Sequence, residues 1–206
     1  TKYVVPTYLD LINELKAKKT IKTDSIFNAF KLIQRQHFIH PSHQHFVGID
    51  RPISIGYGQT NSQPTTVAMM LEWLCPCEGH RILDIGSGSG WTSALLGCIV
   101  GKQGQVNGLE KIPELVEFGL DNLRAFSLEN VSIQLASRHL GLPNQLFDRI
   151  LVSAAAVEFP TSLLDQLKPG GILVIPIEND IIRIHKHLDG SLTKSVFKGF
   201  RFVPLR

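Results

Sequence analysis

From residue 64 onward, short apolar segments alternate with segments in which apolar residues recur every three or four positions. The short segments cover residues 81–85, 105–110, 131–135, 149–153 and 172–177. Each has the length of a buried strand, and the three- to four-residue period between most of them is that of a helix face. Alternating strands and helices predict a parallel sheet whose connections are right-handed crossovers.

The two ends of the chain depart from this alternation. In the first 63 residues, two amphipathic helices precede a loop over residues 37–48, and Thr23 or Asp24 can cap the second helix. A helix is expected from Pro160 to residue 167. Near the other end, Asp189-Gly190 separates two apolar segments, as in a hairpin with a type I′ turn, and residues 202–205 can add an edge segment.

We therefore expect an α/β fold, with a doubly wound, mostly parallel seven-stranded sheet and an N-terminal helical extension. The whole chain, residues 1–206, is interpreted as a single domain. Residues 1–63 form the helical and loop extension of that domain, and residues 64–206 form its α/β core.

Composition and charge argue against several kinds of partner. The 206 residues are 43% hydrophobic and 19% charged, and 21 basic against 18 acidic residues leave a net charge of +3. The basic residues are scattered, so no nucleic-acid footprint is indicated. No apolar run reaches the ~20 residues that span a bilayer, and the first residues lack a signal-peptide layout. Three cysteines are a sparse, odd set, which suits a reducing cytoplasm.

A glycine-rich loop follows the first core strand and precedes a helix. It reads Asp84-Ile85-Gly86-Ser87-Gly88-Ser89-Gly90, and glycines there let the backbone turn tightly and approach a ligand. Glu110 ends the next strand, twenty residues after Gly90, the spacing typical of a carboxylate that binds ribose hydroxyls. The pattern predicts a nucleoside site at the carboxyl ends of the strands; the alternative is a tight turn without a ligand.

A second polar segment, residues 56–64, runs into the helix that starts at Pro64. Thr60 and Ser62 lie two positions apart, so in an extended segment both side chains would point the same way. Their hydroxyls could then donate two hydrogen bonds to one carboxylate. Alternatively, Ser62 caps the helix that follows.

Both segments resemble known motifs. The glycine loop, with Asp84 two positions before Gly86, resembles the first motif of class I S-adenosylmethionine-dependent methyltransferases, which have a Rossmann-like fold. Residues 56–64 resemble the G-x-G-Q-T-x-S-x-P signature of the protein-L-isoaspartate O-methyltransferase family. Further similarity to that family is seen over residues 34–41, 147–155, 160–176 and 202–205, so the resemblance spans nearly the whole chain.

The resemblance implies S-adenosyl-L-methionine as cofactor and S-adenosyl-L-homocysteine as product. The implied reaction is protein repair: methylation of the α-carboxylate of L-isoaspartyl residues in damaged proteins or peptides, whose ester closes to a succinimide and reopens partly to aspartate. The cofactor-binding residues would be Gln59, Asn61, Asp84, Gly86, Gly88, Gly90, Glu110, Lys111 and Ser137. Ser62 and Thr60 would form the catalytic site, with Ser62 as an orienting donor, because a carboxylate is already ionised at pH 7. A monomer is expected.

One position departs from the family pattern. Ala136-Ser137-Arg138 stands where the family has G-D-G, whose Asp bonds the adenine amino group. Ser137 can still accept a hydrogen bond but carries no charge, a difference worth ~1.5–3 kcal/mol of cofactor binding. Two alternatives stay open: a methyltransferase for another carboxylate or peptide, or a degenerate member that only binds ligand.

Three other groups of residues invite interpretation. The four histidines between His37 and His45 are interrupted by Pro41 and lack helical ligand spacing, so no metal site is predicted. Cys75 and Cys77 are interpreted as a helix-end packing feature because C-x-C does not match a zinc or redox motif. Trp91, which follows the glycine loop, could contact the cofactor or fill the core.

Overall fold

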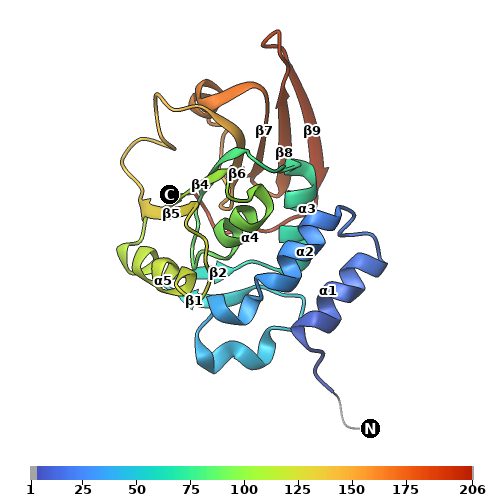
Figure 1. The fold of residues 1–206 in the computed structure, drawn as a ribbon. Helices are drawn as coiled ribbons and strands as arrows, with labels where there is room; N and C mark the ends of the chain where they lie inside the picture. The colour runs from blue at the N-terminus through green and yellow to red at the C-terminus, as the bar shows by residue number, and fades with distance from the viewer. Residues whose placement is uncertain (1–3, 206) are drawn as a thin grey trace.

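The computed structural model describes residues 4–205 and is built around one seven-stranded sheet (Figure 1). The strand order is β5-β4-β3-β6-β7-β8-β9, and β8 alone runs against its two neighbours. The strands are β3 (Arg81–Ile85), β4 (Gln105–Glu110), β5 (Val131–Leu135), β6 (Phe147–Val152), β7 (Leu167–Ile177), β8 (Asp180–Lys186) and β9 (Leu192–Lys198). The expected α/β fold with its mostly parallel seven-stranded sheet is confirmed.

Helices cover one face of this sheet. They are α1 (Tyr8–Ala17), α2 (Asp24–Leu32), α3 (Pro64–Leu74), α4 (Trp91–Val100) and α5 (Pro113–Leu123). Alternate strand residues such as Ile82, Leu151 and Val174 share one buried cluster with these helices. The apolar residues of α1 and α2 belong to the same cluster, so the N-terminal extension packs directly on the core.

The other face of the sheet is covered by a short 3-10 helix and loops. Leu83 and Ile150, which neighbour Ile82 and Leu151 in sequence, point to a second cluster with the 3-10 helix η3 (Thr161–Gln166) and the loop after β5. The helix expected from Pro160 is thus only a 3-10 helix, and β7 already begins at Leu167. The long connection between β5 and β6 contains no helix.

Three local expectations need adjustment, and a fourth is confirmed. The loop at 37–48 contains the 3-10 helix η2 (Pro41–Phe46) and the end of η1 (Arg35–Phe38). Thr23 occupies the N-cap of α2 but makes no capping bond. Residues 202–205 do not extend a sheet edge: Pro204 forms an isolated bridge with Ala155, just beyond β6. The hairpin expected around Asp189-Gly190 is confirmed as β8–β9.

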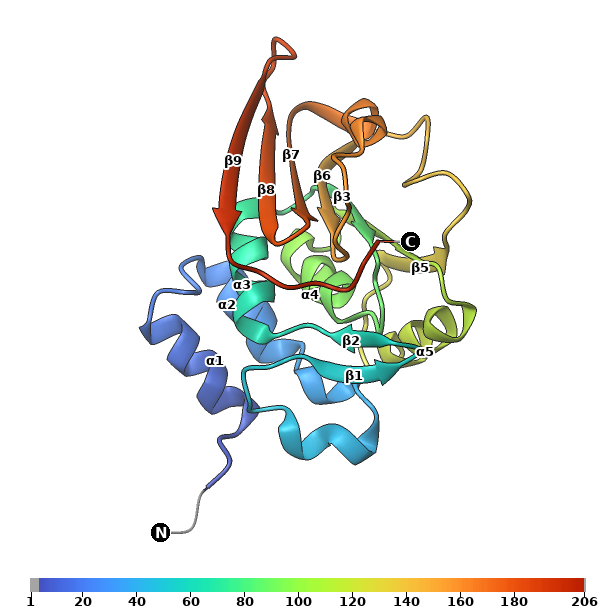
Figure 2. The ribbon, with the colours of Figure 1, turned by 180° about the vertical axis from the view of Figure 1, so that it is seen from behind.

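A second hairpin was not foreseen. Strands β1 (Ile53–Gly56) and β2 (Gln59–Asn61) pair antiparallel and place Tyr57 at their tip. Ile53 and Ile55 pack on Leu115 of α5, and the two elements lie side by side in Figure 2. The hairpin thereby brings the polar segment to the carboxyl ends of the sheet strands. Among residues 4–205, no helix has the length and apolar character needed to cross a membrane.

Candidate active site

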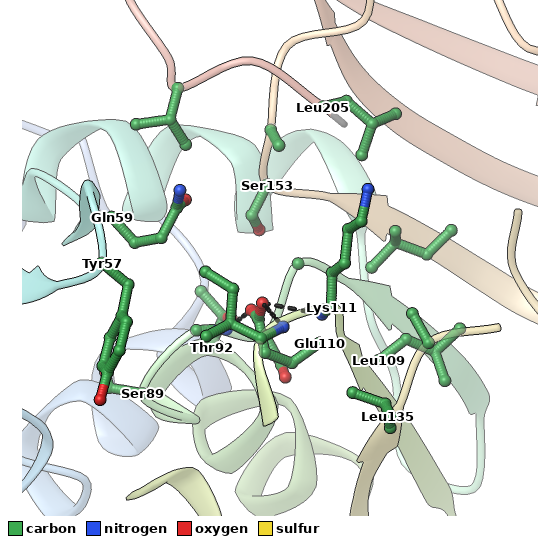
Figure 3. Close-up of a pocket in the computed structure, with 18 of the residues that line it drawn as sticks. Tyr57, Gln59, Ser89, Thr92, Leu109, Glu110, Lys111, Leu135, Ser153 and Leu205 are labelled. Atoms are coloured by element: carbon green, nitrogen blue, oxygen red, sulfur yellow. Dashed lines mark hydrogen bonds between the residues drawn. The ribbon is translucent and has the colours of Figure 1, made fainter. Parts of the chain in front are cut away.

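A cavity of about 1090 Å³ opens where β3, β4, β5 and β6 end (Figure 3). The order of the strands explains its position, because the chain passes from β3 to β4 on one side and later returns to β6 on the other. The β1–β2 hairpin and residues 203–205 complete its wall. Nine of the eleven predicted site residues line it: Gln59, Thr60, Asn61, Ser62, Gly86, Gly88, Glu110, Lys111 and Ser137.

Glu110 ties the glycine loop to the end of β4. Its Oε2 accepts a hydrogen bond from the Gly88 N–H at 2.8 Å, and its Oε1 accepts from the N–H groups of Lys111 and Ile112 at 2.8 and 3.0 Å. The side chain is only 7% exposed, so its orientation toward the cavity is fixed. Two carboxylate oxygens offer about four acceptor positions, which leaves capacity for a ligand hydroxyl.

The glycine loop needs its glycines for two different reasons. Gly86 and Gly88 line the cavity with φ values of 83° and 53°, in the left-handed region that other residues rarely adopt. Gly90 also has a positive φ but lies behind the loop, where a Cβ would be 3.0 Å from Cδ1 of Ile133. Gly90 therefore serves the packing of α4 and does not border the cavity.

Asp84 is the second predicted residue that does not reach the cavity. It is fully buried, and its Oδ2 accepts hydrogen bonds from the hydroxyls of Thr92 and Ser93 at 2.8 and 2.6 Å. Burial raises the pKa of Asp84 to about 6, with a smaller contribution from the charge of Glu110. Its Oδ1 has no hydrogen-bond partner. Asp84 thus lies beneath the loop, and Thr92 stands between it and the cavity.

The polar segment faces the glycine loop across the cavity. Thr60 is exposed, Ser62 is half-buried, and both line the cavity. Asn61 is buried and its Nδ2 donates to Oγ of Ser89, 3.4 Å away. Gln63, not Ser62, occupies the N-cap of α3, and Asp50 accepts from the N–H of Thr65. The alternative in which Ser62 caps the helix is therefore wrong.

The β5 end of the cavity carries no acid. The exposed Ser137 accepts a hydrogen bond from the His139 N–H at 3.1 Å, and Arg138 donates to the His139 ring. Among the described residues that line the cavity, Glu110 is the only carboxylate.

Several functional candidates were missed by the sequence analysis. Ser87 lines the cavity, is 4% exposed, and its hydroxyl has no partner, so it is available to a ligand. Arg35 and the loop residue Ser153 were also missed. Trp91 proves to be mainly a core residue, since its Nε1 donates to the carbonyl of Ile33 and its ring meets Phe30 edge-to-face.

The four histidines between His37 and His45 and the pair Cys75 and Cys77 do not line this cavity. His40 bonds Ser42, and the ring of His37 packs on Phe126. Within residues 4–205, no three His, Cys, Asp or Glu side chains are grouped to hold a metal ion. Cys75 is the C-cap of α3 with a φ of 51°, as expected of a residue at a helix end, but Cys75 and Cys77 are both exposed, so the expected packing role is not seen.

The residues present fit an adenosyl ligand. The Glu110 carboxylate can accept from a ribose diol, the unpaired Ser87 hydroxyl can reach a polar group, and the open backbone at Gly86 permits close approach. A sheet of this order with a glycine loop after β3 and an acid at the end of β4 defines a class I S-adenosylmethionine-dependent methyltransferase.

Comparison with known proteins gives the family. The model of the protein-L-isoaspartate(D-aspartate) O-methyltransferase (PCMT) family matches residues 7–206, and the chain belongs to this family. The predicted family is thereby confirmed.

Curated relatives and a solved structure agree. Protein-L-isoaspartate O-methyltransferases of Pyrococcus horikoshii and Archaeoglobus fulgidus are 38% and 40% identical to this chain, over 94% and 89% of it and 90% and 86% of the relatives. A Plasmodium falciparum PCMT structure in complex with S-adenosyl-L-homocysteine aligns with a TM-score of 0.87 and 29% identity, over 97% of this chain and 98% of that one.

Proposed function

We propose that this chain transfers the methyl group of S-adenosyl-L-methionine to the α-carboxylate of L-isoaspartyl residues in damaged proteins or peptides. The observation that carries the proposal is that the hydroxyl-bearing segment 60–62 and the ribose-type carboxylate Glu110 line one cavity. The names of the relatives and the ligand of the Plasmodium protein support the same activity.

The residues that bind the acceptor carboxylate, Thr60 and Ser62, need only orient it. The bound cofactor supplies an electrophilic methyl group, and the acceptor carboxylate is ionised at neutral pH, so no strong base is needed. Thr60 and Ser62 donate hydrogen bonds that hold the carboxylate in line without neutralising it. Gln59 and Asn61 border the same place.

The cofactor side combines loop and strand ends. Glu110 accepts from the ribose hydroxyls, the Gly86–Gly88 backbone and Lys111 surround them, and Ser137 meets the base. The buried Asp84 adds a negative charge under the loop. The enzyme acts as a monomer in which residues 1–63 form the acceptor side and residues 64–206 hold the cofactor.

Ser62→Ala is expected to reduce kcat/KM for an isoaspartyl peptide by at least about tenfold, the effect of losing one hydrogen bond to a charged group. Binding of S-adenosylhomocysteine, measured by calorimetry, should stay within about threefold, since Ser62 lies across the cavity from Glu110.

The matched control is Ser42→Ala, a serine that bonds only His40 and does not line the cavity. The normal aspartyl peptide serves as substrate control. Wild-type protein that binds S-adenosylhomocysteine yet methylates only some other carboxylate would replace the proposed acceptor. Binding without any transfer would indicate a degenerate member.

Ser137→Asp is expected to tighten S-adenosylhomocysteine binding by about tenfold, because a carboxylate restores a charge-assisted acceptor at the base end of the cavity. Ser132→Asp is the control, since Ser132 is an exposed β5 residue outside the cavity. Equal dissociation constants for Ser137→Asp and wild type would show that the base does not lie against Ser137.

A further inference from the structure

Arg35 is the largest fully buried side chain, and it forms no ion pair with a carboxylate among residues 4–205. A buried guanidinium without a contacting counter-ion is unusual, because such groups are normally paired. Its N–H groups donate instead to oxygen atoms within residues 49–62. This segment includes Thr60 and Ser62, which are proposed to bind the acceptor carboxylate.

The contacts of Arg35 join the two ends of the β1–β2 hairpin. Before β1, its guanidinium donates to the carbonyls of Ile49 and Arg51 at 3.2 and 2.6 Å. At the end of β2 and just after it, the guanidinium donates to the carbonyls of Asn61 and Ser62 at 3.2 and 3.0 Å. One rigid side chain therefore closes the base of the hairpin.

The same guanidinium also reaches the cofactor side indirectly. Its Nε donates to Oδ1 of Asn61 at 2.7 Å, and this bond turns the Asn61 amide so that Nδ2 points to the hydroxyl of Ser89. The guanidinium lies over the ring of Trp91, 5.7 Å from its centre. The glycine loop and the acceptor segment are thus held against each other through Arg35.

We propose that Arg35 is a positioning residue for methyl transfer, which locks the hairpin base and thereby places the hydroxyls of Thr60 and Ser62 against the cofactor loop. This inference rests on the proposed function. Arg35 does not line the cavity, so it acts through the segment it holds. A lysine cannot reproduce the lock, because it lacks the planar fork that reaches five acceptors.

The test compares Arg35→Lys with Tyr8→Phe. Tyr8 is buried and donates to the carbonyl of Phe30, but it makes no hydrogen bond to the hairpin. For Arg35→Lys we expect kcat/KM for the isoaspartyl peptide to fall at least about tenfold while S-adenosylhomocysteine affinity stays within about threefold. Tyr8→Phe should lower the melting temperature without changing kcat/KM.

A second readout does not depend on activity. Tyr57 is 59% exposed at the hairpin tip, so chymotrypsin cleavage after Tyr57, followed by mass spectrometry, reports on hairpin opening. Cleavage should be at least about tenfold faster in Arg35→Lys than in wild type or Tyr8→Phe, because local opening becomes easier. If Arg35→Lys does not fold, Asn61→Ser removes the Nε contact together with the bond to the Ser89 hydroxyl, leaves the four carbonyl contacts of Arg35, and should give a smaller increase in the cleavage rate.

The two proposals fail differently. A wild-type protein inactive on the isoaspartyl peptide contradicts the proposed function, whereas the cleavage experiment still tests the lock. Unchanged cleavage and unchanged kcat/KM in a folded Arg35→Lys protein would overturn the role of Arg35. So would an equal loss of activity and faster cleavage in Tyr8→Phe, which would indicate a general loss of stability.

Discussion

Glu110→Gln is expected to weaken S-adenosylhomocysteine binding at least a hundredfold, about 3 kcal/mol. The carboxylate accepts three backbone hydrogen bonds, and an amide can accept with one end only. Its NH₂ group would face either the Gly88 N–H or those of Lys111 and Ile112, so the loop would shift and the contact to a ribose diol would be lost. Calorimetry on the folded variant measures the change.

Glu114→Gln provides the matched control, because Glu114 is an exposed glutamate at the start of α5 that does not line the cavity. It should bind as wild type does. Thermal unfolding separates a local loss of affinity from a loss of fold. A Glu110→Gln protein that binds within threefold of wild type would show that Glu110 only supports the loop.

Much of the fold was predictable because its signals are local. Buried parallel strands are short apolar runs, and Asp189-Gly190 specifies a tight hairpin. The helix expected from Pro160 was overestimated because its apolar spacing suits a helix, whereas Leu167 is recruited into β7, where it pairs with Phe147. Such recruitment depends on residues distant in sequence.

The site was predictable where a sequence motif specifies a known backbone conformation and residue spacing, as for the glycine loop and Glu110. The β1–β2 hairpin was missed because its turn uses positive φ values at Gly56, Tyr57 and Gly58, and tyrosine gives no such signal. The burial of Asp84 beneath the loop could not be inferred either, since an acid after an apolar strand is equally compatible with a cavity wall. The role of Arg35 was missed because four of its five hydrogen-bond acceptors are backbone carbonyls, which the sequence does not reveal.

Asp84→Asn is expected to remove a pH dependence of stability. The pKa of Asp84 is raised to about 6 in the folded protein by burial, from near 4 in the unfolded chain. Between these two pH values the folded state therefore binds more protons than the unfolded state. The stability that the protonated Asp84 carboxyl contributes is fully present below about pH 4 and is lost as the pH rises through 6. Asparagine keeps an acceptor for the hydroxyls of Thr92 and Ser93 and does not titrate.

Urea unfolding at pH 4 and pH 7.5 measures the effect. The unfolding free energy of Asp84→Asn minus that of wild type should be about 2 to 3 kcal/mol larger at pH 7.5 than at pH 4. Asp165→Asn, a change at an exposed residue of η3, should show no such gain. If the difference between Asp84→Asn and wild type is the same at both pH values, the folded carboxyl titrates as in the unfolded chain.

A charge that destabilises the fold at neutral pH calls for a functional reason. Asp84 lies under the glycine loop with one oxygen unpaired, where its field favours a cationic ligand over a neutral one. We therefore expect Asp84→Asn to weaken binding of the sulfonium cofactor more than that of its uncharged thioether product. The ratio of the two dissociation constants, compared with wild type at pH 7.5, measures this preference, and an unchanged ratio would leave the buried charge without a role in binding.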